Sequence, residues 1–335
     1  MKTGKISESV LKRSVLRQIE NQVQEVKKGA GVGGDCAFLA WENPVPGPGE
    51  EMGVAASTQT IALPVKRAAY LAVMAAANNL AAAGAHPVAV TLSLTLPEET
   101  QEQHLREWVR QADECGRELG MQIAGGHTEV SAKVQVPVIT ATALGKGRME
   151  TQSPPESFQG LDIVMSKWIG MEGAFLIASE REQELLGRYP AGLLGGAREQ
   201  GKYLSVAPEA AIAQKSGVYA MHDVRCGGIF GALWEVSQKL GVGLCVNLKK
   251  IPVRQETIEV CEFYNLNPYG LISGGALLML TRQGEYLAEQ LEGAGISAAV
   301  IGKTNGSNDK IVCNKDETRY LGPPVPDEIY KVFQA

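Results

Sequence analysis

The sequence lacks the patterns that mark membrane, secreted, zinc-stabilised and nucleic-acid-binding proteins. No apolar run reaches the length of a membrane-spanning helix, and the start of the chain leads into no apolar signal core. The six cysteines are scattered without a Cys-x-x-Cys pair, and the four histidines show no helical metal-ligand spacing. A net charge of -5 argues against a broad surface for nucleic acid or anionic lipid. We therefore expect a cytoplasmic protein with reduced thiols and with neither nucleic acid nor membrane as a partner.

The length and composition indicate a soluble protein of two domains. The chain has 335 residues, too many for one ordinary hydrophobic core, and 44% of them are hydrophobic and 21% charged. The pattern of elements breaks at residues 150–160, where Ser-Pro-Pro-Glu-Ser at 153–157 reads as a linker. We predict domains over residues 1–150 and 160–335. Each mixes strands and helices without a regular βαβ repeat, which favours an α+β fold over a doubly wound sheet.

Hydrophobic periodicity and glycine or proline boundaries predict the elements of both domains. In the first domain, helices are expected over residues 7–28, 64–83 and 98–119, and strands over 36–41, 88–96, 121–124 and 134–144. In the second domain, strands are expected over residues 162–166, 218–221, 242–247, 276–281 and 298–302. Helices there are expected over residues 173–186, 207–216, 228–240, 255–264 and 283–292.

The densest group of functional residue types lies at residues 221–228, which read Met-His-Asp-Val-Arg-Cys-Gly-Gly at a predicted helix start. Gly227 and Gly228 allow backbone to approach a ligand closely, and the free N–H groups of a helix start favour an anion. Asp223 could hold a divalent cation against that anion, a combination that suggests a nucleotide phosphate. The alternative is a strand-to-helix turn with Asp223 near a cap position, and the local sequence leaves both open.

A glycine-rich segment at residues 29–34 precedes Asp35. Gly29, Gly31 and Gly34 formally match the glycine pattern of a dinucleotide-binding loop, but that motif must follow a strand and open a helix. Here the segment follows a predicted helix and opens a strand, so we interpret it as a flexible loop that delivers Asp35. Asp35 is then either a ligand of Mg²⁺ or an acid that caps a turn.

Two further groups of polar residues belong to the first domain. Asn78 and Asn79 are poor helix formers near the end of an alanine-rich helix, and they indicate either a frayed, solvated end or amides directed at a ligand. The alanines around them suit close packing against another element, for which a dimer partner is one candidate. Residues 125–129, Gly-Gly-His-Thr-Glu, follow a predicted strand, and their glycines again permit close approach of backbone to a ligand.

One cysteine lies in a setting that favours a reactive thiol. Cys226 is next to Arg225 and close to a helix start, both of which lower the pKa of a thiol. No base partner can be identified from the sequence, so we do not expect Cys226 to act as a nucleophile.

Four segments, taken in order, resemble one superfamily. They are residues 34–37, 78–87, 125–129 and 221–228, and their order and spacing are similar to those of the AIR synthase (PurM) group. That group includes the hydrogenase maturation factor HypE, thiamine-monophosphate kinase and selenophosphate synthetase, and the chain is most similar to HypE and AIR-synthase-related proteins. The likeness spans about residues 30 to 320. It implies a PurM-like α+β fold whose N-terminal domain forms a β-barrel across a homodimer, with an α/β sandwich-like C-terminal domain and ATP between the two.

The resemblance also implies a chemistry and a set of site residues. The reaction would be ATP-dependent phosphorylation that activates a small substrate for dehydration or ligation, with Mg²⁺ as cofactor and a maturation protein as a candidate partner. In-line phosphoryl transfer mainly needs positioning and neutralisation of charge. The implied catalytic residues are Asp35, His127 and Asp223, and the implied metal ligands are Asp35, Glu129 and Asp223. The implied nucleotide-binding residues are Gly33, Gly34, Asp35, Asn79, Gly125, Gly126, Glu129, Gly227 and Gly228.

The chain departs from the family pattern at several of these positions. Asn79 and His127 stand where an aspartate is usual, and Gln59 where an acidic residue is usual. Fewer carboxylates weaken the attraction for Mg²⁺. Arg225 and Cys226 replace the usual threonine and charged residue, and the chain lacks the C-terminal cysteine of HypE, so we do not expect HypE's own reaction. An alternative function is a degenerate homologue that binds a nucleotide or a partner protein without catalysis.

Overall fold

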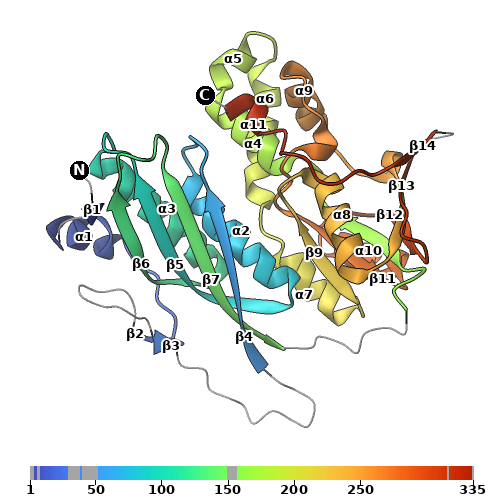
Figure 1. Ribbon diagram of the computed structural model, residues 1–335, viewed down its shortest axis with the longest axis horizontal. Helices are drawn as coiled ribbons and strands as arrows, with labels where there is room; N and C mark the ends of the chain where they lie inside the picture. Colours follow the sequence, from blue (N-terminus) through green and yellow to red (C-terminus); the bar gives the residue numbers. More distant parts are fainter. Residues whose placement is uncertain are drawn as a thin grey trace. The chain divides into compact units, whose positions relative to one another are not determined.

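The computed structural model describes residues 4–5, 8–28, 38–39, 52–148, 157–314 and 317–333. The chain divides into two compact units, Met1–Glu150 and Thr151–Ala335. Each unit combines a β-sheet with α-helices (Figure 1), which confirms the predicted α+β fold class. Within the described residues, no helix is both long enough and apolar enough to cross a bilayer.

A five-stranded sheet forms the first unit, with the strand order β1-β6-β5-β7-β4. β5 and β6 are parallel, and the other neighbours are antiparallel. The strands of this sheet are β1 (Gly4–Lys5), β4 (Met52–Ile61), β5 (Ala85–Leu96), β6 (Gln122–Val130) and β7 (Val138–Arg148). Apart from it, β2 (Val26–Lys28) pairs with β3 (Phe38–Leu39).

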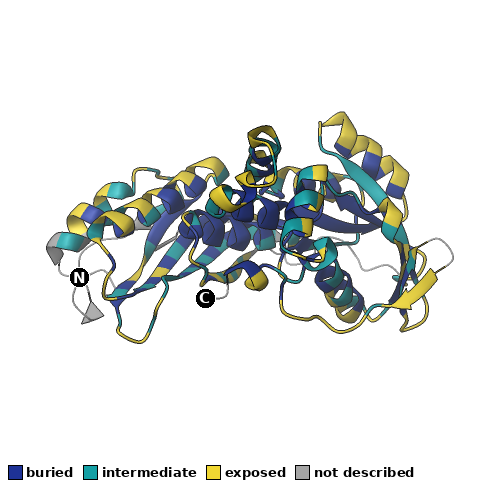
Figure 2. Ribbon diagram, turned by 90° about the horizontal axis from the view of Figure 1, so that it is seen from above, coloured by how far each residue is buried: buried dark blue, intermediate teal, exposed yellow. Residues whose placement is uncertain are grey.

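Two helices, α2 (Ala68–Ala82) and α3 (Glu102–Leu119), cover one face of this sheet (Figure 1). Small alanine side chains let α2 pack closely on β4, β5 and β7, and nearly the whole helix is buried (Figure 2). The amphipathic α3 buries one face and ends at Gly120, whose φ of 68° is the left-handed conformation that closes many helices. The alanines around Asn78 and Asn79 therefore pack against the chain's own sheet, and the expected dimer partner is not needed to bury them.

The opposite face of the same sheet carries polar side chains along β4 and β7. The Oγ1 atoms of Thr58 and Thr142 lie 3.0 Å apart, and those of Thr60 and Thr140 lie 2.9 Å apart. Thr58 and Thr60 are exposed and their partners are half-buried. Cross-strand threonine pairs of this kind stabilise a sheet by a few tenths of a kcal/mol to about 1 kcal/mol each.

The predicted helix over residues 7–28 is wrong beyond its first turns. α1 (Glu8–Ser14) ends early, a short 3-10 turn (Leu16–Gln18) follows, and β2 begins at Val26. Between them, the N–H of Asn21 donates to Oδ1 of Asp113 at 3.4 Å, and the N–H of Val23 donates to Oε1 of Gln122 at 3.1 Å. Side chains of α3 and β6 accept hydrogen bonds from these backbone N–H groups. The segment therefore does not need to form a helix to satisfy them.

A seven-stranded sheet forms the second unit, with the order β14-β13-β10-β12-β8-β11-β9. β10 and β13 are parallel, and the other neighbours are antiparallel. The strands are β8 (Asp162–Ser166), β9 (Ala220–Val224), β10 (Gly243–Asn247), β11 (Ala276–Thr281), β12 (Ala298–Asn305), β13 (Lys310–Asn314) and β14 (Glu317–Tyr320). The helices are α4 (Met171–Glu180), α5 (Glu182–Leu186), α6 (Ala191–Glu199), α7 (Ala207–Lys215), α8 (Gly228–Leu240), α9 (Gln255–Phe263), α10 (Gly284–Gly293) and α11 (Tyr330–Phe333).

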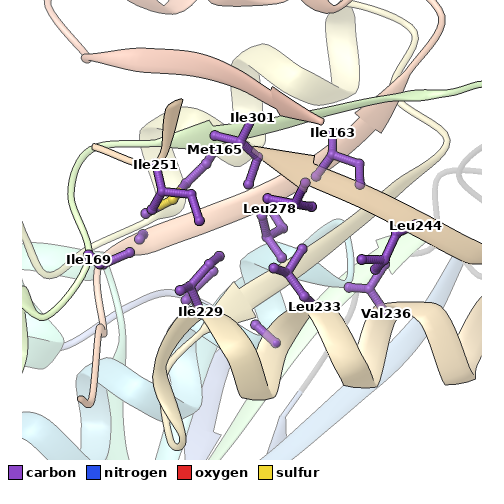
Figure 3. Packing of buried hydrophobic residues seen from close by; sticks show 14 of the residues in the cluster. Ile163, Met165, Ile169, Ile229, Leu233, Val236, Leu244, Ile251, Leu278 and Ile301 are labelled. Carbon is purple, nitrogen blue, oxygen red and sulfur yellow. The ribbon is translucent and has the colours of Figure 1, made fainter. Parts of the chain in front are cut away.

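The core of the second unit lies between α8 and the sheet. Ile229, Leu233 and Val236 recur at helical spacing and so share one face of α8. They pack against strand residues that include Ile163 and Leu278 (Figure 3). Each fully buried side chain of this size contributes about 1.5–3 kcal/mol. This packing fixes the start of α8 relative to the end of β9, where residues 221–228 lie.

Several predicted elements agree closely with the structure and others do not. The strands over 162–166 and 276–281 and the helix over 228–240 are confirmed at both ends. The helix expected over 173–186 is two helices, α4 and α5. β4, α6, β13, β14 and α11 were not predicted.

Candidate functional site

The predicted site residues fall into both units, and part of the set lies outside the described residues. Gly33, Gly34 and Asp35 belong to that part. Asn79 and residues 125–129 lie in the first unit, and residues 221–228 lie in the second.

Residues 125–129 lie inside strand β6, and the prediction that they follow a strand is wrong. Gly126 pairs with Leu92 of β5, beyond a register shift between Val90 and Thr91, and a Cβ at Gly126 would lie 1.9 Å from the Leu92 carbonyl oxygen. Its φ of 155° also disfavours a side chain. By contrast, nothing lies within 4 Å of a Cβ built on Gly125. Gly126 is therefore required by the pairing of β5 with β6, whereas Gly125 leaves backbone open to a ligand.

His127 and Glu129 are two residues apart on β6 and lie on the same face of the strand. Nε2 of His127 is 3.5 Å from Oε2 of Glu129, and both side chains are about half exposed, at 51% and 42%. The hydroxyl of Thr95 donates to Oε1 of Glu129 at 3.3 Å. The carboxylate is thus accessible and weakly held, as a group that binds a ligand from solution must be.

Asn78 and Asn79 lie within α2, so of the two alternatives left open by the sequence, the frayed helix end is wrong. The helix continues to Ala82, and Asn78 is 2% exposed. Nδ2 of Asn79 donates to Oγ of Ser57 on β4 at 3.0 Å. The amide of Asn79 therefore ties α2 to the sheet, a bond that an aspartate at this position could make only by accepting from Ser57.

In the second unit, β9 presents Asp223, and a turn of two left-handed glycines leads into α8. Gly227 has a φ of 75° and Gly228 a φ of 60°, and a Cβ on Gly228 would lie 2.5 Å from the Tyr269 carbonyl oxygen. The N–H of Gly227 donates to Oδ2 of Asp327 at 2.6 Å. The expectation that this amide is free for an anion is therefore wrong, because a carboxylate of the same chain already occupies it.

Asp327 is held firmly at this position. Its Oδ1 also accepts from the N–H of Ile272 at 3.1 Å and from that of Ile329 at 2.9 Å. Burial raises the pKa of Asp327, and its backbone hydrogen bonds oppose that shift. No motif marks this residue in the sequence, because its partners are backbone groups from distant segments.

Asp223 is a buried carboxylate without a hydrogen-bond partner among the described residues. The residue is 7% exposed, and within the described part of the chain neither Oδ1 nor Oδ2 has a hydrogen-bond partner. Burial raises the pKa of Asp223 to about 7; Arg225 and Lys167 oppose the shift, and Glu172 and Glu209 add to it. An unpaired buried carboxylate is costly, so a cation or a hydrogen-bond donor at this carboxylate would be stabilised.

Two buried ion pairs flank Asp223. Arg225 donates to Glu172 through Nε at 3.1 Å and Nη2 at 2.8 Å, a bidentate pair. Nζ of Lys167 lies 2.5 Å from Oε1 of Glu209 and donates to the carbonyl oxygens of Tyr203, Ser205 and Gly275. Burial lowers the pKa of Lys167, and Glu209 opposes that shift.

The sequence reading missed Lys167, Glu172 and Glu209. All are less than 9% exposed. A signal for two of them was present, since Lys167 and Glu172 interrupt the apolar run that includes Met165, Trp168, Ile169 and Met171. Charged residues are almost never buried unless they are paired.

The expectation of a lowered thiol pKa at Cys226 is wrong. Desolvation by the surrounding protein raises the pKa of Cys226, and although Arg225 opposes this, Glu172, Asp327 and Asp223 add to it. The residue as a whole is exposed. Desolvation of the thiol, to which the nearby carboxylates add, thus outweighs the one cation that the sequence places beside it.

The described residues contain no cluster of three or more His, Cys, Asp or Glu side chains arranged to hold a metal ion. Mg²⁺ does not need one, because it usually binds one or two carboxylates and completes its shell with phosphates and water. Asp223 fits this role as an unpartnered oxygen donor, and Glu129 fits it as an accessible one.

Comparison with known proteins gives matches over most of the chain. Residues 32–146 match the family model for the AIR synthase related protein, N-terminal domain, and residues 159–314 match that for the C-terminal domain. A hydrogenase expression/formation protein of Methanocaldococcus jannaschii is 26% identical over 64% of this chain, which is 62% of that protein's length. The carbamoyl dehydratase HypE of Rhodobacter capsulatus is 25% identical over 70% of this chain and 68% of its own.

Solved structures show the same fold. HypE from E. coli superposes with a TM-score of 0.78 at 20% identity, covering 96% of this chain and 98% of that one. A HypE structure in complex with ATP has a TM-score of 0.74 at 20% identity, covering 96% and 95%. Thiamine-monophosphate kinase from Stenotrophomonas maltophilia has a TM-score of 0.68 at 17% identity, covering 93% and 98%.

Proposed function

The chain belongs to the AIR synthase related family, and from this membership we propose that it binds ATP and activates a small substrate by phosphorylation. The observation that carries the proposal is the carboxylate of Asp223, which is buried without a partner beside the glycine turn that starts α8. Family members support it, since HypE has been solved with ATP and a thiamine-monophosphate kinase with AMPPCP and TMP.

In this proposal, Asp35, Glu129 and Asp223 are the residues that would hold Mg²⁺. The ion would supply neutralisation of phosphate charge, which phosphoryl transfer chiefly needs. Gly125 offers open backbone on β6, and the accessible His127 imidazole lies beside Glu129. A pKa of about 7 lets Asp223 hold a proton when no cation is bound.

Calorimetry with ATP and with a non-hydrolysable analogue, each with and without Mg²⁺, tests the proposal. We expect the affinity for nucleotide to increase when Mg²⁺ is present. In Asp223→Asn, this Mg²⁺-dependent increase in affinity should be smaller by about tenfold or more. Asp309→Asn is a matched control, because Asp309 lies on an exposed loop before β13. Absence of binding at millimolar nucleotide, or an equal effect of the two variants, would contradict the proposal.

A homodimer is part of the same proposal. The polar face of the five-stranded sheet, with Thr58, Thr60, Thr140 and Thr142, carries exposed and half-buried side chains and is available to a second copy. Light scattering after size exclusion tests this, with a dimer as the expected mass. Thr58→Lys should shift the mass towards the monomer, whereas an unchanged mass would remove this face from consideration.

A second candidate function is a non-catalytic homologue that binds a nucleotide or a maturation partner. Two contacts favour it: the Asn79 amide is engaged by Ser57, and the Gly227 amide is engaged by Asp327. A HypE–HypF complex shows that a family member with this fold binds a partner protein. ATP hydrolysis that is robust in the native chain and absent in Asp35→Ala would refute this candidate.

A further inference from the structure

Two cysteines that are far apart in the sequence meet on the second sheet. Sγ of Cys245 on β10 lies 3.6 Å from Sγ of Cys313 on β13, across 68 positions of sequence. β10 and β13 are parallel neighbours, with Cys245 paired to Ile311 and Asn247 paired to Cys313. Residues two apart on a strand share a face, so both thiols project from the same side of the sheet.

The thiols lie on the side of β10 that faces away from the apolar core. Leu244 and Val246, the neighbours of Cys245, are buried in the cluster under α8. Cys245 is exposed and Cys313 is half-buried. A small reagent can therefore reach the pair, unlike Cys115 and Cys261, which are buried.

The distance between the two sulfur atoms is a contact and not a bond. A disulfide requires about 2.05 Å, so the sulfurs must approach by roughly 1.5 Å. Because Cys313 is the diagonal neighbour of Cys245 and not its paired residue, closing the bond requires a shift of the strand backbones as well as side-chain rotation. Burial, together with the hydrogen bond and charge of Cys313, raises the pKa of Cys245. Cys245 is thus mainly a neutral thiol at neutral pH.

We propose that Cys245 and Cys313 form a reversible thiol–disulfide pair that is oxidised by exchange with a small-molecule disulfide. One cysteine attacks the disulfide, forms a mixed disulfide and releases one small thiol. The second cysteine then displaces the other small thiol and closes the internal bond. The two cysteines lose two electrons, the reagent gains them, and both thiol protons end on the two released small thiols.

The internal bond links β10 covalently to β13. β13 leads into β14 and then into the segment that places Asp327 at the start of α8. The cross-link closes a loop that runs from Cys245 to Cys313, across 68 positions of sequence. A loop of this length restricts the unfolded chain strongly, so the oxidised protein should be the more stable form.

Cys226 provides an internal comparison. It is also exposed, but among the described residues its thiol lies against a guanidinium and not a second thiol, with Nη1 of Arg225 3.5 Å from Sγ. Attack by Cys226 on a small disulfide should therefore stop at the mixed disulfide. The same small disulfide should therefore give an internal disulfide between Cys245 and Cys313 but only a mixed disulfide at Cys226.

Incubation of the full chain with oxidised glutathione, followed by alkylation and peptide mass mapping, tests the proposal. We expect a Cys245–Cys313 linked peptide, a glutathione adduct on Cys226 and reversal of both by a reducing agent. The linked form should melt about 5–10 °C higher than the reduced form. Glutathione adducts that persist on Cys245 or Cys313, or a linked peptide with another partner, would overturn the proposal.

Single variants provide the matched control. In Cys245→Ser, Cys313 should retain a glutathione adduct, and in Cys313→Ser, Cys245 should retain one, while Cys226→Ser should still form the internal bond. Loss of zinc from the purified protein on alkylation of these two thiols would assign the pair to a metal and would also overturn the proposal.

Discussion

The residues predicted to form one nucleotide site lie in two different physical settings. In the first unit, His127 and Glu129 stand half exposed on β6, with Nε2 and Oε2 3.5 Å apart. In the second unit, Asp223 is buried among two ion pairs, Lys167–Glu209 and Arg225–Glu172. Exposed charges are screened by solvent, whereas buried charges depend on every partner they have. Substitutions of the exposed pair should therefore alter ligand binding with little effect on folding, whereas substitutions in the buried ion pairs should alter folding.

The largest effect should come from removing one member of the bidentate pair. Glu172→Leu removes the bidentate carboxylate partner of the buried Arg225 guanidinium and should lower the free energy of unfolding by about 3–5 kcal/mol. Denaturant unfolding measures this, with Lys303→Ala as control, because Lys303 is 67% exposed in its pair with Asp162 and should cost less than about 1 kcal/mol.

A double variant separates charge from packing at the same pair. Glu172→Leu combined with Arg225→Met removes both charges and should recover much of the loss. If the double variant is as unstable as the two single losses added together, the loss of the Glu172 carboxylate from the buried guanidinium is not the cause.

Next in size is a pH effect from Asp223. Its pKa is raised to about 7 in the folded chain from an ordinary value near 3.8, so the protonated form favours the fold. The contribution is fully present below pH 4, is lost as pH rises through 7, and amounts to about 4 kcal/mol at most. Unfolding curves between pH 4 and 8 should show this fall in the native chain. Asp223→Asn should flatten it, and an unchanged slope would place the titration elsewhere.

The glycine pair of β6 tests the first unit. Gly126→Ala forces a Cβ against the Leu92 carbonyl and should cost about 3 kcal/mol, whereas Gly125→Ala meets open space and should cost less than about 1 kcal/mol. Melting temperatures compare the two variants. The ranking by nucleotide affinity, measured on folded protein, should be the reverse of the ranking by stability, because Gly125→Ala should weaken binding more than Gly126→Ala. Equal melting temperatures of the two variants would contradict the structural role of Gly126.

The smallest change in stability is expected from Asn79→Asp. The bond to Ser57 can be kept with the donor reversed, so the free energy of unfolding should change by about 1 kcal/mol or less. The added carboxylate should strengthen Mg²⁺-dependent ATP binding several-fold, measured by calorimetry. A loss of several kcal/mol would show that the amide is needed for the packing of α2 on β4.

Sequence patterns predicted those elements whose local signals agree with their tertiary setting. The strand over 276–281 is a continuous apolar run, and the helix over 228–240 begins and ends at glycines. β4 was missed because its Ala-Ser-Thr-Gln composition shows no apolar alternation, although half of its residues face α2. The helix predicted over residues 7–28 extends too far. The spacing of its apolar residues fits a helix, but it fits equally well a non-helical segment whose backbone N–H groups bond to side chains of α3 and β6.

The candidate site follows the same rule. Asp223, Gly227 and Gly228 lie within one short segment and are predicted together, and the structure places them in one strand, turn and helix start. Glu209 and Asp327 could not be found, because each acquires its role from groups that meet only in the folded unit.

The hydrogen bond between Asp327 and the Gly227 amide has a thermodynamic consequence. A phosphate that took this amide would have to displace a carboxylate tethered to the same chain, an internal competitor at a fixed and high effective concentration. Occupancy of the helix start and docking of residues 321–333 would then exclude each other. Linkage requires the converse as well: a partner that drew this segment away would raise the affinity of that amide for an anion by the same factor.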